Sequence, residues 1–332
     1  MNRFFILVFF FLFQISLGQV RPEIKDLVKK ISDFGFLGTR SNGQSRIELE
    51  RDLNFMRLDS IASEEDLLFL VEDKSPLIRC VAFDGLISRN IEKSTQILNN
   101  HLLDSEYINL YMGCTSQSST VANEFVNKYV YNLIEKDSIV SDKNRNLVKN
   151  LNAKILENPL ISMNYKTRLI YELEINKENY KLIRKIASQN IEPISFVSLS
   201  KYHNKNDVKI ILASLENPKF EIYSLITVKE FPEKQFYKKI VSIFESEIEK
   251  NKFDYSKLRL LHKTLAKYPN ELKTIELFEK TFLVKEESRK SMKEYLWMAI
   301  TKCPSPKFDV FNSRLLDVDK VNSFLLEEMD YD

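Results

Sequence analysis

The chain has 332 residues, of which 44% are apolar, and its 49 basic residues nearly balance 47 acidic ones, for a net charge of +2 at neutral pH. This balance excludes the strongly basic footprint of a nucleic-acid-binding protein or of a protein held on an anionic membrane surface. Three cysteines are too few for a disulfide-built scaffold, and the lack of glycine after Gly113 excludes glycine-rich phosphate loops and nucleophile elbows from most of the chain.

Residues 1–18 have the pattern of a secretory signal peptide. Arg3 supplies a basic start, the stretch from Phe4 to Phe13 is unbroken and apolar, and Ser16 and Gly18 are small residues at the expected cleavage site. The alternative is an uncleaved membrane anchor, but the segment is shorter than the roughly 20 residues that a spanning helix needs. We therefore expect an exported protein, periplasmic or secreted, with no transmembrane segment in the mature chain. The absence of Asn-x-Ser/Thr sequons favours bacterial export.

Residues 19–45 are predicted to form an N-terminal helix followed by a flexible loop. Pro22 takes the first helical position, and Ile24, Leu27 and Ile31 fall on one face. The stretch 35–43 then holds three of the six glycines together with Thr, Ser and Asn, which is typical of a loop or hinge.

The segment from Ser63 to Arg89 predicts two helices joined by a short turn. Ser63 followed by Asp66 has the form of a capping box, with Asp in place of Glu, and apolar residues come directly after it. Ser75 then caps a second helix, in which Pro76 takes the first position.

This helix–turn–helix resembles a HEAT repeat. Asp73 in the turn, Ile78 and Arg79 at the start of the second helix, and then Ala82 and Leu86 match the D…VR..A..AL pattern of that family. The match covers one repeat of about 30 residues. In HEAT proteins the turn Asp and the Arg tie adjacent repeats together, so the resemblance implies a structural role for Asp73 and Arg79.

Weaker echoes of this unit recur along the chain. Residues 208–228 align with residues 66–86 without a gap, and residues 306–311 nearly repeat residues 218–223. Helix pairs that cannot bury their apolar faces alone stack into a continuous core. We therefore predict an all-α fold, an α-α superhelix or HEAT-like helical-repeat solenoid, over residues 46–332. The alternative is an irregular helical bundle.

Cys80 and Cys114 form a candidate disulfide. They lie 34 residues apart, about one helical-repeat length, which places them on neighbouring layers of a repeat array. The alternative is that Cys80 is simply a small buried apolar residue of its helix. The stretch from Gly113 to Thr120 is expected to be a polar loop between helices, either a binding loop or a connector whose Thr120 caps the next helix.

The sequence shows no assembled catalytic, cofactor or metal site. His101, His203 and His262 lie far apart, and no HExxH or CxxC pattern is present. We therefore assign no catalytic residue and no metal ligand, and we expect no cofactor.

Helical repeats expose broad faces that suit protein partners. The hypothesis from the sequence is an exported, non-catalytic binding or scaffold protein that works through protein–protein interaction and binds no nucleic acid. Two alternatives stay open: a periplasmic enzyme whose site is assembled only in the fold, and an exported immunity-type protein that blocks a toxin.

Overall fold

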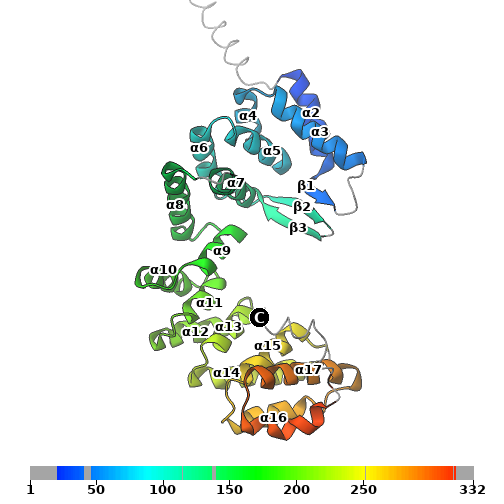
Figure 1. Cartoon of the computed structure of the whole chain (residues 1–332), viewed down its shortest axis with the longest axis vertical. Helices are drawn as coiled ribbons and strands as arrows, with labels where there is room; N and C mark the ends of the chain where they lie inside the picture. The colour runs from blue at the N-terminus through cyan, green and yellow to red at the C-terminus, as the bar shows by residue number, and fades with distance from the viewer. Residues whose placement is uncertain are drawn as a thin grey trace, which may run out of the picture. The chain divides into compact units, whose positions relative to one another are not determined.

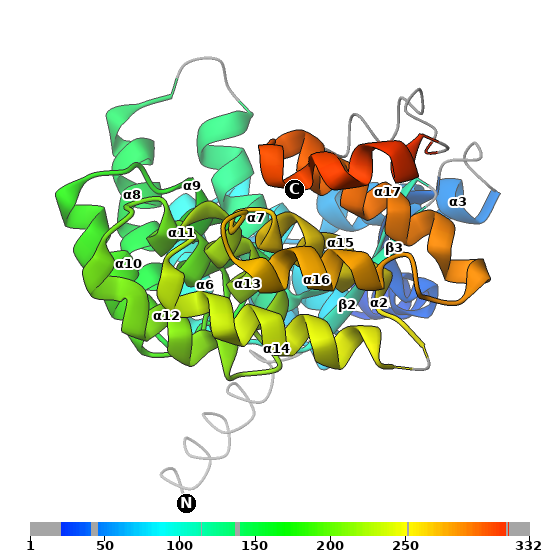
Figure 2. The same ribbon diagram turned by 90° about the horizontal axis from the view of Figure 1, so that it is seen from below.

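The computed structural model describes residues 21–40, 46–113, 115–136, 140–250, 252–316 and 318. The predicted signal peptide and Cys114 lie outside these residues. The chain is predominantly helical, as the glycine-poor sequence predicts (Figures 1 and 2). It divides into two compact units, Met1–Leu169 and Ile170–Asp332, which we call unit 1 and unit 2 and describe separately. Among the helices that the structure describes, none has the length and apolar content needed to cross a membrane.

Unit 1 consists of helices and a small sheet. Its helical elements are α2 (Pro22–Phe34), α3 (Arg46–Ile61), α4 (Glu64–Leu70), α5 (Pro76–Ile87), α6 (Ile91–His101), α7 (Val121–Val130), the π-helical turn η1 (Tyr131–Glu135) and α8 (Asp142–Glu157). The boundary between the units falls inside α9 (Asn164–Glu172).

The helix pair α4–α5 forms where the capping signals predict it. The Ser63 hydroxyl accepts from the backbone N–H of Asp66 at 3.2 Å, and the Asp66 carboxylate accepts from the Ser63 N–H at 2.9 Å. Arg21 also donates to this carboxylate, which fixes the start of α2 beside the start of α4. Pro76 occupies the first turn of α5, where its missing N–H costs no hydrogen bond.

The N-terminal helix α2 is part of the core of unit 1. Its buried face, Ile24, Leu27 and Ile31, belongs to the same apolar cluster as Leu58 of α3 and Ile78 of α5. These side chains share one core, so α2 packs with α3 and α5.

A three-stranded sheet stands where the sequence predicts two loops. Its strands are β1 (Phe36–Arg40), β2 (Tyr107–Gly113) and β3 (Thr115–Thr120), in the order β1-β2-β3. β1 runs parallel to β2, with Phe36 opposite Asn109, and β2 runs antiparallel to β3. The expectation of loops at 35–43 and 113–120 is therefore wrong for the residues in these strands. The sequence of β1 alone does not show the strand, because its pairing partner β2 is far away in the chain.

In the residues that the structure describes, unit 2 is built of helical elements. They are α10 (Lys177–Ser188), α11 (Ile194–Ser200), η2 (Lys205–Asp207), α12 (Val208–Leu215), α13 (Glu221–Glu230), η3 (Lys234–Phe236), α14 (Tyr237–Ile248), α15 (Tyr255–Leu265), α16 (Leu272–Lys280), α17 (Glu286–Lys302) and η4 (Pro306–Leu315). The segment that echoes α4–α5 in sequence is the pair α12–α13, which is joined by a buried hydrogen bond of 2.8 Å between the Ser224 and Ser214 hydroxyls.

Candidate functional site

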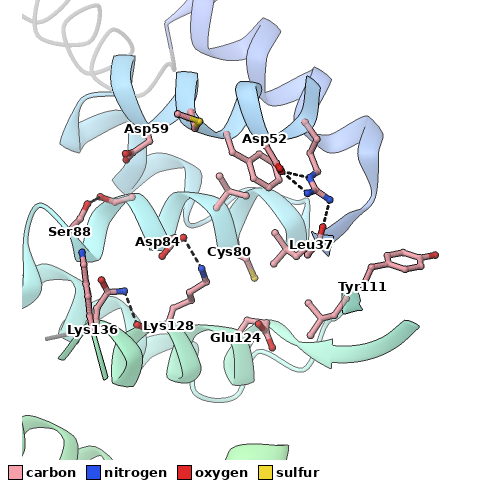
Figure 3. A pocket seen from close by; sticks show the side chains of 18 residues that line it. Leu37, Asp52, Asp59, Cys80, Asp84, Ser88, Tyr111, Glu124, Lys128 and Lys136 are labelled. Carbon is pink, nitrogen blue, oxygen red and sulfur yellow. Dashed lines mark hydrogen bonds and ion pairs between the residues drawn. The ribbon is translucent and has the colours of Figure 1, made fainter. Parts of the chain in front are cut away.

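A pocket of about 660 Å³ opens in unit 1 between α3, α5, α7 with η1, and the strands β1 and β2 (Figure 3). Each helix contributes residues spaced three or four apart, so that one face of the helix lines the pocket. On α3 these are Asp52, Phe55, Met56 and Asp59; on α5 Cys80, Val81, Asp84, Gly85 and Ser88; and on α7 and η1 Glu124, Lys128 and Asn132. The helical turns thus combine apolar and charged side chains on one surface.

The apolar part of the lining comes from both the helices and the sheet. Leu37 of β1 and Leu110 of β2 face the pocket together with Phe55 and Val81. Met56 of α3 lines the same pocket and is 68% exposed. An exposed large apolar side chain at the edge of an apolar pocket favours binding of an apolar group there.

Arg51 joins α3 to the first strand. Its side chain is 2% exposed, and its Nη2 lies 2.6 Å from the Asp52 carboxylate. Its Nη1 donates to the carbonyl oxygen of Gly38 in β1. The guanidinium also lies 5.1 Å from the centre of the Phe36 ring and 5.7 Å from that of Phe55, within the range of cation–π attraction.

The carboxylates around the pocket and Lys128 have partners within the protein, whereas Lys136 lines the pocket as an exposed lysine. Lys128 of α7 forms an ion pair of 2.9 Å with Asp84 of α5 (Figure 3). The Glu124 carboxylate is buried and accepts from the Ser119 hydroxyl at 2.6 Å. Asp59 pairs with Arg89 at 2.8 Å. Because these carboxylates already have partners, the pocket holds a balanced set of charges around an apolar floor.

Cys80 lies in the wall of this pocket on α5 (Figure 3). It is buried, and burial raises the pKa of its thiol above the ordinary value. A thiol with a raised pKa is a poor nucleophile at neutral pH. Cys114 lies outside the described residues, so the disulfide between Cys80 and Cys114 stays a prediction.

Asp73 and Arg79, the two residues that carry the HEAT resemblance, lie in one polar network. The Asp73 carboxylate accepts from the Ser75 N–H at 2.8 Å, and Arg79 donates to the Asp73 carbonyl oxygen at 2.8 Å. Arg79 also forms ion pairs with Asp104 at 3.1 Å and with Glu106 at 2.9 Å. Arg79 therefore links the start of α5 to the segment between α6 and β2.

The three histidines lie in three different environments. His101 contacts Asp104 at 3.2 Å and Glu72 at 3.1 Å, partners that the sequence analysis missed although Asp104 is only three residues away. His203 is exposed and packs edge-on against a phenylalanine. His262 is fully buried among aromatic rings, and burial lowers its pKa to about 4. In the part of the chain that the structure describes, no three His, Cys, Asp or Glu residues are arranged to hold a metal ion.

Comparison with known protein families, with curated proteins and with solved structures gave no match for this chain.

Proposed function

We propose that the protein is an exported, non-catalytic binding protein, and that the pocket of unit 1 holds apolar side chains of a segment from a partner protein. The observation that carries this proposal is the combination of an open apolar floor with carboxylates that already have partners. Burial of apolar surface supplies most of the free energy of such association, whereas the paired charges around the floor orient the partner.

The pairing of the charged groups favours binding over catalysis. A general acid or base needs a pKa matched to its task and a position within reach of the reacting proton. In this pocket Lys128 neutralises Asp84, Arg51 neutralises Asp52, and burial raises the pKa of the Cys80 thiol. These groups hold the walls of the pocket together, and the accessible apolar side chains are the ones that can contact a ligand.

The helical arrangement is the second support for the proposal. α5 packs against α4, α6 and α7, and α13 packs against α12, α11 and α15. Such contacts between successive helices suit a degenerate HEAT-like solenoid, in which each pair buries its apolar face on its neighbours. The proposal of export, to the periplasm or beyond, is based on residues 1–18, whose pattern is that of a signal peptide.

A crosslinking pull-down from the native envelope fraction tests this function. Met56→Glu places a charge where we expect an apolar contact, and Met56 is exposed enough (68%) for the fold to tolerate the change. The matched control is Leu160→Glu, since Leu160 is also in unit 1, is 75% exposed and does not line the pocket. Loss of one buried apolar side chain weakens binding by about tenfold or more.

Support for the proposal requires one partner that the wild-type chain and the Leu160→Glu variant capture equally, and that the Met56→Glu variant captures about tenfold less. If the two variants behave alike, the pocket is not the contact surface. If no protein is captured by any form of the chain, the assignment of a protein partner is wrong.

A further inference from the structure

A second pocket, of about 730 Å³, opens in unit 2 between α10 and the turn that leads into η2. One wall is the face of α10 that carries Lys181, Arg184 and Lys185, and the other wall includes Asn204 and Asn206. The site lies in the other unit, so it does not depend on the function proposed for the pocket of unit 1.

Arg184 is held in place by a buried carboxylate. Its Nε lies 2.7 Å from the Asp207 carboxylate, which is 1% exposed. Tyr180 donates to the same carboxylate at 3.0 Å, and Asn204 donates to the Tyr180 hydroxyl oxygen at 2.8 Å. This network fixes the guanidinium through Nε. The guanidinium also interacts with the Tyr180 hydroxyl, and its two terminal nitrogens form no ion pair with a carboxylate among the described residues.

Lys181 and Lys185 add two further positive charges on the same face of α10. Both are exposed, and neither forms an ion pair within the described part of the chain. Of the residues that the structure describes, no acidic one lines the pocket, and the Asp207 carboxylate beside Arg184 is neutralised by it. Glu178, the acidic residue of α10, does not line the pocket. The pocket therefore has an excess of positive charge and unused hydrogen-bond donors.

We propose that this pocket binds the phosphate group of a phosphate monoester. Arg184 offers a planar fork that matches two oxygens of a phosphate, and Lys181 and Lys185 neutralise the two charges of the phosphate, since the charge of Arg184 is balanced by Asp207. Asn204 and Asn206 line the same pocket, and the Asn206 amide is a further donor for the remaining oxygens of a tetrahedral group. A carboxylate has one charge and two oxygens, so it uses the Arg184 fork and the charge of only one of the two lysines.

Isothermal titration calorimetry of the full chain with inorganic phosphate, with glycerol phosphate and with acetate tests the proposal. In the double variant Lys181→Gln/Lys185→Gln the network of Arg184 and Asp207 stays intact, so the fold is expected to survive, and far-UV circular dichroism checks this. We expect a loss of affinity for phosphate of about tenfold, because each exposed charge contact contributes modestly. The control Lys219→Gln/Lys238→Gln changes the net charge equally, at exposed lysines of unit 2 outside the pocket.

Arg184→Lys adds an independent test, because it keeps the charge beside Asp207 and removes the fork. It should weaken phosphate binding and leave the thermal unfolding midpoint nearly unchanged. The proposal is overturned if acetate binds as tightly as phosphate, if no phosphate compound binds, or if the control pair loses as much affinity as the Lys181/Lys185 pair.

The same chemistry is found in soluble phosphate esters and in the headgroup of phosphatidic acid. Sedimentation with vesicles that contain phosphatidic acid distinguishes these sources. Binding to the vesicles that is tighter than to glycerol phosphate, and that the Lys181→Gln/Lys185→Gln variant loses, assigns a membrane lipid. Binding to glycerol phosphate without binding to vesicles assigns a soluble ester.

Discussion

Replacing Arg51 with Met removes the guanidinium that joins α3 to β1 and keeps an unbranched side chain of comparable reach. Arg51 is 2% exposed, donates to the Gly38 carbonyl and pairs with Asp52 at 2.6 Å. The change therefore tests whether the wall of the pocket formed by β1 depends on this one side chain.

The expected loss is about 2–3 kcal/mol of the free energy of unfolding of unit 1. Most of it comes from the bond to the Gly38 carbonyl, since a hydrogen bond to a charged group contributes about 1.5–3 kcal/mol. The ion pair adds about 0–1 kcal/mol, because Asp52 is 31% exposed and water replaces its partner. The Met side chain retains the apolar packing near Phe55, so the cavity it leaves is small.

Urea unfolding measures this loss with two probes. Far-UV circular dichroism follows the helices of both units, whereas the fluorescence of Trp297, the single tryptophan of the chain, follows unit 2. We expect the Arg51→Met variant to shift the dichroism transition and to leave the fluorescence transition in place. The control is Arg57→Met on the same helix, because Arg57 is exposed. A loss in Arg51→Met no larger than in the control would refute the reasoning.

Two further predictions concern a strand glycine and a buried histidine. Gly38 has φ of 88°, and an added Cβ would overlap the Tyr111 carbonyl, whereas the space around Gly35 (φ 70°) is open. In urea unfolding, Gly38→Ala should therefore cost clearly more than Gly35→Ala, for which the positive φ alone costs about 1 kcal/mol; equal losses would contradict this. The pKa of His262 is about 4 in the folded chain, against an ordinary 6.5. Between these values the unfolded chain binds the additional proton, so stability falls as pH falls from 6.5 to 4, by about 3 kcal/mol. Trp297 fluorescence in urea should show this pH dependence in the wild type, and an equal dependence in His262→Gln would show that another group causes it.

The helices could be predicted because their signals are local. Ser63 with Asp66, and Pro76 at the start of α5, place the α4–α5 pair correctly, and Thr120 accepts from the Asn123 N–H at 3.3 Å as a cap of α7. Each signal acts over three or four residues, a distance at which sequence spacing alone decides which groups meet. Of the predicted all-α solenoid, the coarser part is confirmed: the chain is predominantly helical, with one small sheet.

The pocket could not be predicted, because it is assembled from segments that are distant in sequence. Arg51 of α3 contacts Gly38 of β1, and Lys128 of α7 contacts Asp84 of α5, across 13 and 44 residues of the chain. The sequence did contain a weaker signal, a stripe of charged and apolar residues three or four positions apart on α3. Such a stripe alone is also typical of a solvated helix face, so it does not identify a pocket.

The scarcity of glycine explains why the two candidate sites are built differently. Gly38 and Gly85 both line the pocket of unit 1, and at Gly85 an added Cβ would lie 3.1 Å from the Asp59 carboxylate of α3. These glycines let a strand and a helix approach their neighbours closely, which shapes a pocket from the backbone. Unit 2 has no glycine, because Gly113 is the last one in the chain. Its candidate site therefore depends on long side chains that extend from a helix, with Arg184 fixed by a buried acid.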